Sequence, residues 1–136
     1  MLYGPRGSGC SPGKPFAGPI SYFDIHTTGT LAELAQARAD LAIIALLHAD
    51  IVAALEGAGR IRCRAALALS SGLPAVQCAE LLSIAKRHGV HLLGPNTLGF
   101  QRLALGLNAS AAGMLAAPGP LALVSQSGAL TTSILN

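Results

Sequence analysis

Five short segments in the middle of the chain alternate between continuous apolar runs and apolar residues at helical spacing. This alternation is the feature that most restricts the possible fold. Leu41–Leu47 is a continuous apolar run of the kind buried on both faces of a parallel sheet. Asp50–Ala58 follows with helical spacing, and Ala65–Leu69 is the next apolar run. Val76–His88 is again helical, and Val90–Leu93 is a third strand candidate. Strands joined by helices at such short spacings predict right-handed βαβ units, and therefore an α/β fold with a parallel sheet.

Each of the two helical segments carries an apolar face that would pack on the sheet. The expected core-facing residues are Ile51, Leu55 and Ala58 in the first helix, and Ala79, Leu82, Ile84 and Ala85 in the second. Gly59 is expected to end the first helix, and Gly89 the second. Ligands of such sheets bind at the carboxyl ends of the strands, so the loops after the three strands are the places to seek a site.

The two ends of the chain have a different pattern. Residues 1–15 are rich in Gly and Pro and show no apolar periodicity, so we expect them to be irregular or disordered. Leu98–Pro120 has weak periodicity and ends in Pro-Gly-Pro, which favours a linker between domains. A new strand is expected from Leu121, and a helix begins shortly before the last residue, Asn136.

The composition fits one domain with a packed core. Of the 136 residues, 51% are hydrophobic and 11% are charged, which suits helices packed on a sheet. The mean hydropathy is +0.54. However, the most apolar stretch, Leu41–Leu47, is far shorter than the ~20 residues that a membrane span needs. No signal-peptide pattern follows Met1, so we expect a cytoplasmic protein without a membrane partner.

The formal net charge is +3, but the basic residues form no continuous run. Arg60, Arg62 and Arg64 alternate over one short segment, and Lys86 and Arg87 end a helix candidate. A nucleic-acid partner is not expected, because neither a basic stripe nor aromatic stacking platforms are visible. The favoured interpretation is a solvated loop and a helix C-terminus, although the surplus charge could also favour a small phosphate-bearing ligand.

No residue set indicates a metal site or a disulfide framework. Cys10, Cys63 and Cys78 are widely spaced and include no CxxC pair. The four histidines have no Cys or carboxylate at metal-ligand spacing. His48 differs from the other three, which favour surface or capping roles, because it follows a strand at the end where ligands bind.

Two glycine-bearing turns are the most specific functional signal. Gly94-Pro-Asn-Thr-Leu-Gly99 and Ser125-Gln-Ser-Gly128 each follow a short apolar run. A strand, a small polar turn and a helix together point backbone N–H groups at an anion, so these turns predict phosphate binding. A serine nucleophile is the rival interpretation, but Gly-x-Ser-x-Gly is absent and no base is identifiable. The turn Ser70-Ser-Gly72 is equally compatible with phosphate binding and with a simple strand-to-helix connection.

Three segments, in this order, closely resemble the nucleoside-diphosphate-forming acyl-CoA synthetases, which include relatives of the succinyl-CoA ligase α-subunit. These segments are Leu92–Gly99, Gly106–Ser110 and Leu123–Leu130. The Gly-Leu-Asn-Ala-Ser piece is most similar to the branch fused to a GNAT domain, the Pat-type protein lysine acetyltransferases. The similarity runs from about Phe16 to Asn136.

The resemblance implies a domain organisation. An irregular segment at 1–15 would precede a Rossmann-like CoA-binding domain at 16–117. Residues 118–136 would then form the first strand and helix start of a flavodoxin-like, succinyl-CoA ligase-like domain. The Rossmann-like sheet is expected to be incomplete at its N-terminus, because the residues before Phe16 do not supply the strand with which the family opens.

The resemblance also implies binding residues. The groove for CoA would be lined by Leu46, Leu47, Ser70, Ser71 and Gly72, and the thioester would face Pro95, Asn96 and Thr97. A phosphoryl group would be bound by Ser125, Ser127 and Gly128. Thr97 stands where the family commonly has Cys. No catalytic residue and no metal ligand is implied within this chain.

By this resemblance the chain is a CoA- or acyl-CoA-binding fragment, inactive alone, of an acid–CoA ligase (ADP-forming) or a protein N-acetyltransferase. ATP or ADP would act only through regions that this chain lacks. Its partners would be a CoA thioester and a ligase β-type subunit or further domains of the same protein. Two alternatives remain open: a stand-alone CoA-binding regulatory protein without catalysis, and a nonfunctional remnant that needs a partner chain to cover its sheet edge.

Overall fold

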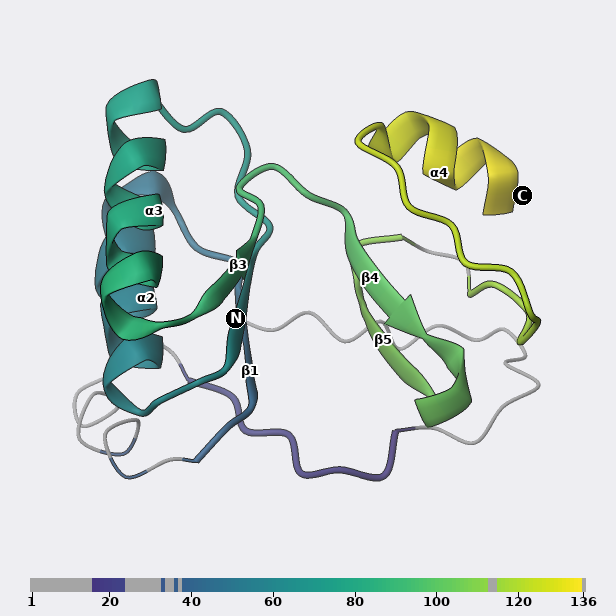
Figure 1. The fold of residues 1–136 in the computed structure, drawn as a ribbon, viewed down its shortest axis with the longest axis horizontal. Helices are drawn as coiled ribbons and strands as arrows, with labels where there is room; N and C mark the ends of the chain where they lie inside the picture. The colour runs from purple at the N-terminus through teal and green to yellow at the C-terminus, as the bar shows by residue number, and fades with distance from the viewer. Residues whose placement is uncertain (1–15, 24–32, 34–35, 37, 113–114, 136) are drawn as a thin grey trace. The chain divides into compact units, whose positions relative to one another are not determined.

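The computed structural model describes residues 16–23, 33, 36, 38–112 and 115–135 (Figure 1). The chain divides into two compact units, of which unit 1 contains Ser21–Thr97 and unit 2 contains Leu98–Asn136. The expected domain boundary near residue 117 concerns the family's domains rather than these units, and it stays a prediction. The expected irregular segment 1–15 lies outside the described residues.

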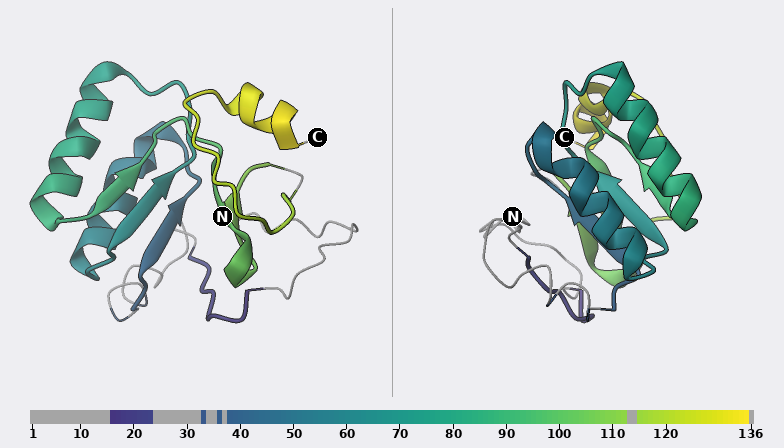
Figure 2. Two further views of the ribbon diagram at one scale, coloured as in Figure 1. Left: turned by 45° about the vertical axis from the view of Figure 1, so that its right-hand side comes forward. Right: turned by 90° about the vertical axis from the view of Figure 1, so that its left-hand side faces the viewer.

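Unit 1 is an α/β layer with a three-stranded parallel sheet in the order β1-β2-β3. The strands are β1 (Leu41–Ile44), β2 (Ala65–Ala68) and β3 (His91–Leu93). Helices α2 (His48–Arg60) and α3 (Ala75–His88) connect them and lie side by side on one face of the sheet (Figure 2). The predicted α/β fold with a parallel sheet is therefore confirmed.

The core of unit 1 lies between this sheet and the two helices. Its buried residues are Ile44, Ile51, Leu55, Ala66, Ala68, Leu81, Ile84, Ala85 and Val90. The face predicted for the first helix is confirmed, because Ile51, Leu55 and Ala58 are all buried. Small alanines in β2 let both helices approach the central strand closely, which is how a short sheet can still hold a dense core.

The core face of α3 was predicted only in part. Ile84 and Ala85 are buried as expected, but Ala79 is exposed and Leu82 is 61% exposed. Leu81, which the periodicity did not single out, is fully buried. The apolar pattern of this helix is ambiguous because Leu81 and Leu82 are adjacent, and only the packing against α2 selects one of them.

Two element boundaries also differ from expectation. β1 ends at Ile44, because the chain after it turns toward α2 although Ala45, Leu46 and Leu47 are still apolar. Gly59 does not end α2, which continues to Arg60 with Ile61 as its C-cap. A Cβ atom on Gly59 would lie 2.3 Å from Cγ of His88, so this glycine permits close helix–helix approach rather than a stop. Gly89 does cap α3, at φ 68°.

Unit 2 contains an antiparallel hairpin that the sequence did not predict. β4 (Gly99–Arg102) and β5 (Leu107–Ser110) pair across a short 3-10 helix, η1 (Leu103–Leu105). The expected linker at Leu98–Pro120 is therefore wrong over its first half. A Cβ on Gly99 would lie 2.1 Å from the Ala109 carbonyl oxygen, which explains a glycine at the open end of the hairpin, where Gly99 pairs with Ser110.

The last described segment forms a helix but no strand. α4 (Gly128–Leu135) begins where the turn Ser125–Gly128 predicts a helix start. The strand expected from Leu121 is not formed, since no neighbouring strand within the described residues pairs with Leu121–Val124. The side chains of Leu121 and Val124 are 94% and 95% exposed.

Candidate functional site

Three loops follow the carboxyl ends of β1, β2 and β3, and Ser70 connects all three. Its hydroxyl donates a hydrogen bond of 2.6 Å to the Leu46 carbonyl oxygen, in the loop after β1. Its own carbonyl oxygen accepts a hydrogen bond of 2.8 Å from the backbone N–H of Asn96, in the loop after β3. The structure thus brings together the predicted residues at 46–47, 70–72 and 95–97, and we call this region the carboxyl edge.

His48 and Gln77 add a second connection at the carboxyl edge. Nε2 of His48, the first residue of α2, lies 2.7 Å from the carbonyl oxygen of Ser71. The Gln77 side-chain amide in turn donates to the carbonyl oxygen of His48. The start of α2, the loop after β2 and the first turn of α3 are therefore linked. The sequence does not single out Gln77, because nothing in the spacing shows that its amide reaches α2.

The backbone of the third loop requires its glycine. Gly94 has φ 97°, and a Cβ atom there would lie 2.3 Å from the carbonyl oxygen of Ala68. The following peptide bond, between Gly94 and Pro95, is cis, and Asn96 has φ 58°. This compact turn presents the exposed Asn96 side chain beside the half-buried Pro95 and Thr97. Polar donors and acceptors are thus accessible at the end of β3.

Both helices begin at the carboxyl edge without a side-chain cap. The N-cap residues are Leu47 for α2 and Pro74 for α3, and neither makes a side-chain hydrogen bond to its helix. Uncapped N–H groups and the helix dipole favour an anion at such an end. α2 carries Asp50 in its first turn, whereas α3 has no acidic residue there. The N-terminus of α3 is therefore the more favourable of the two for a phosphate.

The remaining predicted groove residues are accessible to a ligand. Leu47 is 76% exposed, Leu46 is half-buried, and Ser71 and Gly72 are exposed. The three loops, at 45–47, 69–74 and 94–97, contain no Lys or Arg. The surplus positive charge that could favour a phosphate-bearing ligand is therefore not supplied by the residues of these loops. Anion binding here would rely on backbone N–H groups and polar side chains.

The predicted phosphate turn of unit 2 acts as the cap of α4. The Ser127 hydroxyl accepts a hydrogen bond of 3.2 Å from the Leu130 backbone N–H. The Ser125 hydroxyl accepts one of 3.0 Å from the Ser127 backbone N–H. Both side chains are exposed, and Gly128 is half-buried. The turn belongs to unit 2, whereas the carboxyl edge belongs to unit 1.

Titratable groups outside the carboxyl edge have structural roles. Glu56 of α2 accepts hydrogen bonds from Arg87 and from Nε2 of His88, the latter at 2.8 Å. The His88 bond lowers the pKa of Glu56, and the charge of Arg87 acts in the same direction. Burial raises the pKa of the Cys63 thiol. Among the described residues no group of His, Cys, Asp and Glu could hold a metal ion.

The comparisons with known proteins identify relatives of one kind. An ADP-forming acetate–CoA ligase of Methanocaldococcus jannaschii is 33% identical over 101 residues, which are 71% of this chain and 14% of that protein. A second, from Archaeoglobus fulgidus, is 34% identical over 102 residues, 71% of this chain and 15% of that protein. The α-subunit of such a ligase from Pyrococcus furiosus is 41% identical over 56 residues, 41% of this chain and 12% of that subunit.

The chain is similar to ADP-forming acetate–CoA ligases. The resemblance to acyl-CoA synthetases is therefore confirmed as a similarity in sequence. Nothing among these relatives supports the acetyltransferase branch. The chain spans only 14% and 15% of the length of the first two relatives. No family model matches the chain.

Solved structures agree with this similarity. A crystal structure of a Pyrococcus horikoshii protein has a TM-score of 0.70 and 28% identity, over 74% of this chain and 24% of that chain. The dinucleotide-forming acetyl-coenzyme A synthetase 1 of Candidatus Korarchaeum cryptofilum, in complex with phosphate and ADP, has a TM-score of 0.68 and 26% identity. That match covers 74% of this chain and 22% of that chain.

The described helices are too short or too polar to cross a lipid bilayer.

Proposed function

We propose that the carboxyl edge of unit 1 binds CoA or an acyl-CoA, and that the chain supplies this binding region to an ADP-forming acyl-CoA synthetase. The proposal is carried by the Ser70 bonds, which hold the loops after three parallel strands together at the end of the sheet where α/β proteins bind ligands. The similarity to acetate–CoA ligases selects CoA among the possible phosphate-bearing ligands.

The residues divide into two kinds of contact. The Leu46 and Leu47 side chains offer apolar surface to the pantetheine arm, and Pro95, Asn96 and Thr97 face the thioester. Ser71 and Gly72, next to the uncapped N-terminus of α3, receive a phosphate group through backbone N–H donors. Because the loops lack Lys and Arg, we expect weak binding of the isolated chain and competition by inorganic phosphate.

Ser125, Ser127 and Gly128 are proposed to bind a phosphoryl group at the start of α4. The exposed hydroxyls and the helix N-terminus support this, since preorganised donors stabilise transferred phosphoryl charge without having to move. The acyl-CoA-forming reaction itself, with its nucleotide, is proposed to need a ligase β-type subunit or further domains. One relative is a separate α-subunit, which is consistent with that division.

Calorimetric titration of the full chain with CoA tests the proposal. Ser71→Asp places a carboxylate on the exposed turn after β2, and repulsion of the phosphates is expected to weaken binding by about tenfold. Ser83→Asp is the matched control, because Ser83 is also exposed but lies farther along α3. Equal affinities of the two variants, or no heat with CoA for the unmodified chain, would contradict the proposal.

A further inference from the structure

Five basic side chains of unit 1 come together in the structure, although the sequence shows them as separate short groups. Arg60 is the last residue of α2, and Arg62 and Arg64 lie in the loop that leads to β2. Lys86 and Arg87 lie in the last turn of α3. All five residues are exposed. We call them the basic surface.

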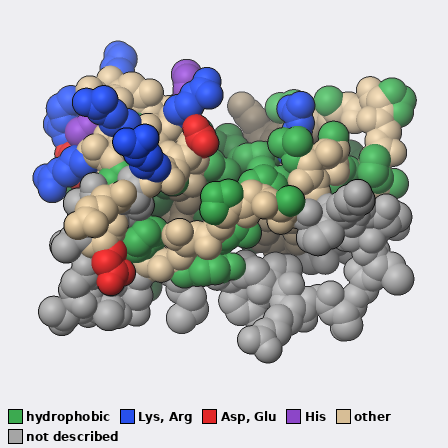
Figure 3. Space-filling model, turned by 90° about the horizontal axis from the view of Figure 1, so that it is seen from below, with side chains coloured by type: hydrophobic (Ala, Val, Ile, Leu, Met, Phe, Trp, Pro, Cys, Tyr) green, Lys and Arg blue, Asp and Glu red, His purple; other side chains and the backbone are tan. Residues whose placement is uncertain are grey.

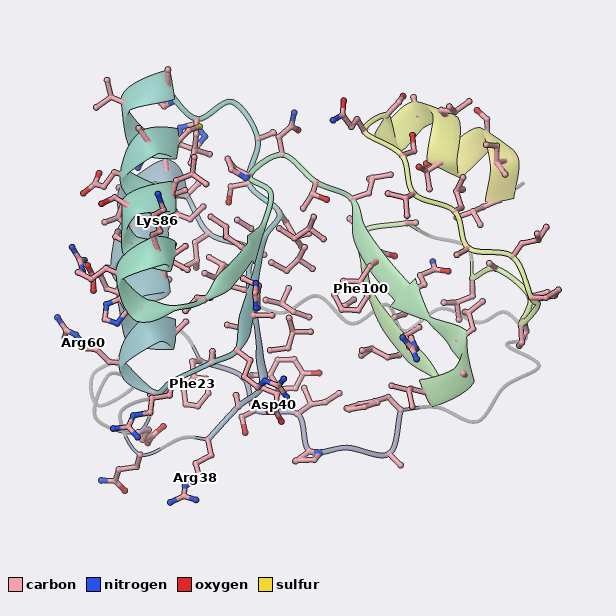
Figure 4. All side chains as sticks on the ribbon, viewed as in Figure 1. Phe23, Arg38, Asp40, Arg60, Lys86 and Phe100 are labelled. Atoms are coloured by element: carbon pink, nitrogen blue, oxygen red, sulfur yellow. The ribbon has the colours of Figure 1, made fainter. Side chains whose placement is uncertain are left out.

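The backbone and one ion-pair cluster explain why these residues are neighbours. Glu56 of α2 pairs with Arg87 of α3, so the last turns of the two helices are adjacent. The backbone N–H of Arg64 donates to the carbonyl oxygen of Asp40, which fixes the loop after α2 beside the start of β1. Figure 3 shows Lys and Arg side chains gathered over this part of unit 1. Figure 4 shows Arg60 directed away from the sheet.

The basic surface lies at the opposite end of the strands from the carboxyl edge. Parallel strands begin at one edge of a sheet and end at the other. The five residues lie at or just after the C-terminal ends of α2 and α3, where the chain returns to the starts of the strands. The carboxyl-edge loops carry no Lys or Arg. These five positive charges are therefore separated from the proposed CoA site, and CoA does not account for them.

Two observations indicate the kind of partner that fits. The surface combines four arginines and one lysine with only two carboxylates, those of Glu56 and Asp40, so its net charge is positive and complements an acidic protein face. Arginine pairs with carboxylates in a planar, bidentate geometry. No Phe, Tyr or Trp stands among the five residues or next to them in the chain, so the surface lacks the aromatic platforms typical of single-stranded nucleic-acid sites.

The relatives add an independent reason to expect a protein partner. In two of them the matched region makes up 14% and 15% of a longer chain. In a third it belongs to a subunit. We propose that the basic surface is an interaction surface for an acidic face of a second protein or protein domain. This goes beyond CoA binding and does not depend on it.

Binding of labelled poly-L-glutamate to the full chain, followed by fluorescence anisotropy, tests the inference with a probe of the stated chemistry. Arg64→Glu is expected to weaken binding roughly threefold to tenfold at low salt, and Arg64→Lys much less. Arg102→Glu is the matched control, because it changes the net charge equally but lies in β4 of unit 2. Raising the ionic strength to about 0.15 M should reduce binding of the unmodified chain.

The outcomes separate the possible partners. Loss of binding in Arg64→Glu but not in Arg102→Glu supports the proposal. Equal loss in both variants would show a net-charge effect without a defined surface, and would overturn it. Tighter binding of duplex DNA, or of vesicles with anionic lipid, than of poly-L-glutamate would overturn it in favour of another class of partner. No binding of poly-L-glutamate at low salt would overturn it as well.

Discussion

Nε2 of His48 lies 2.7 Å from the carbonyl oxygen of Ser71, so the first residue of α2 is tied to the turn that follows β2. Because the acceptor is a carbonyl oxygen, the Nε2 atom carries the proton in this contact. The ring thereby holds the Ser71 turn in place, and Gly72 lies against the same ring, where an added Cβ would be 3.8 Å from Cε1. The His48 side chain makes no proposed contact with the ligand, but it orients the Ser71 turn, which does.

His48→Ala is expected to loosen the turn after β2 while unit 1 stays folded. Loss of one exposed hydrogen bond costs about 1 kcal/mol or less, and the amides near Ser71 should exchange faster with solvent. Hydrogen exchange measured by mass spectrometry checks this. His91→Ala is the control, because His91 is exposed and lies at the other edge of the sheet. Unchanged exchange near Ser71 in His48→Ala would contradict the structural role.

Leu81 and Leu82 are adjacent, and the structure assigns them opposite environments. Leu81→Ala is expected to lower the free energy of unfolding by about 2–5 kcal/mol, since it creates a cavity in the core. Leu82→Ala should change it by about 0.5 kcal/mol or less, because that side chain is mostly in solvent. Urea denaturation of both variants decides between them. Equal losses would show that α3 is rotated relative to the described packing.

Glu56 should make the stability of unit 1 depend on pH. The folded chain lowers its pKa, so the Glu56 carboxylate stabilises the fold above the ordinary carboxyl pKa of about 4.3. That stabilisation is lost as the pH falls through the lowered folded value. Melting temperatures of the unmodified chain and Glu56→Gln should therefore differ near neutral pH and converge under acid conditions. Glu80→Gln, an exposed control on α3, should show no such convergence.

Gly94 permits the loop after β3 to approach β2. Gly94→Ala combines a positive φ with a Cβ that would meet the Ala68 carbonyl oxygen, so we expect a loss of about 1–3 kcal/mol in unfolding free energy. Gly119→Ala is the control, because no atom lies within 4 Å of its added Cβ. Chemical denaturation measures both. A Gly94→Ala chain as stable as the control would contradict the close approach.

The sequence predicts the architecture of unit 1 well, for a physical reason. Continuous apolar runs such as Leu41–Ile44, separated by helical spacing, leave few solutions other than parallel βαβ units. The predictions from the sequence fail where tertiary contacts decide which residues are buried. The choice of Leu81 over Leu82 depends on packing against α2, and Gly59 serves contact with His88 rather than a helix stop.

The hairpin and the strand expected from Leu121 show that strand formation depends on a partner strand as well as on the local sequence. β4 and β5 have little apolar alternation and depend on pairing with each other, so periodicity did not reveal them. Leu121–Val124 has strand-like composition, yet within the described residues it has no partner strand to pair with. For the candidate site, the predicted ends of the strands gave the positions of the three loops. The spacing of residues did not predict the hydrogen bonds of Ser70, His48 and Gln77 that connect these loops.

Hydrogen exchange of the full chain with and without saturating CoA tests the central claim most directly. The account predicts slower exchange in two peptides, one covering 69–77 and one covering 94–97. It predicts no change in peptides covering 56–64 and 86–88, where the basic surface lies. Protection confined to the basic surface, or no protection in either loop at saturation, would contradict CoA binding at the carboxyl edge.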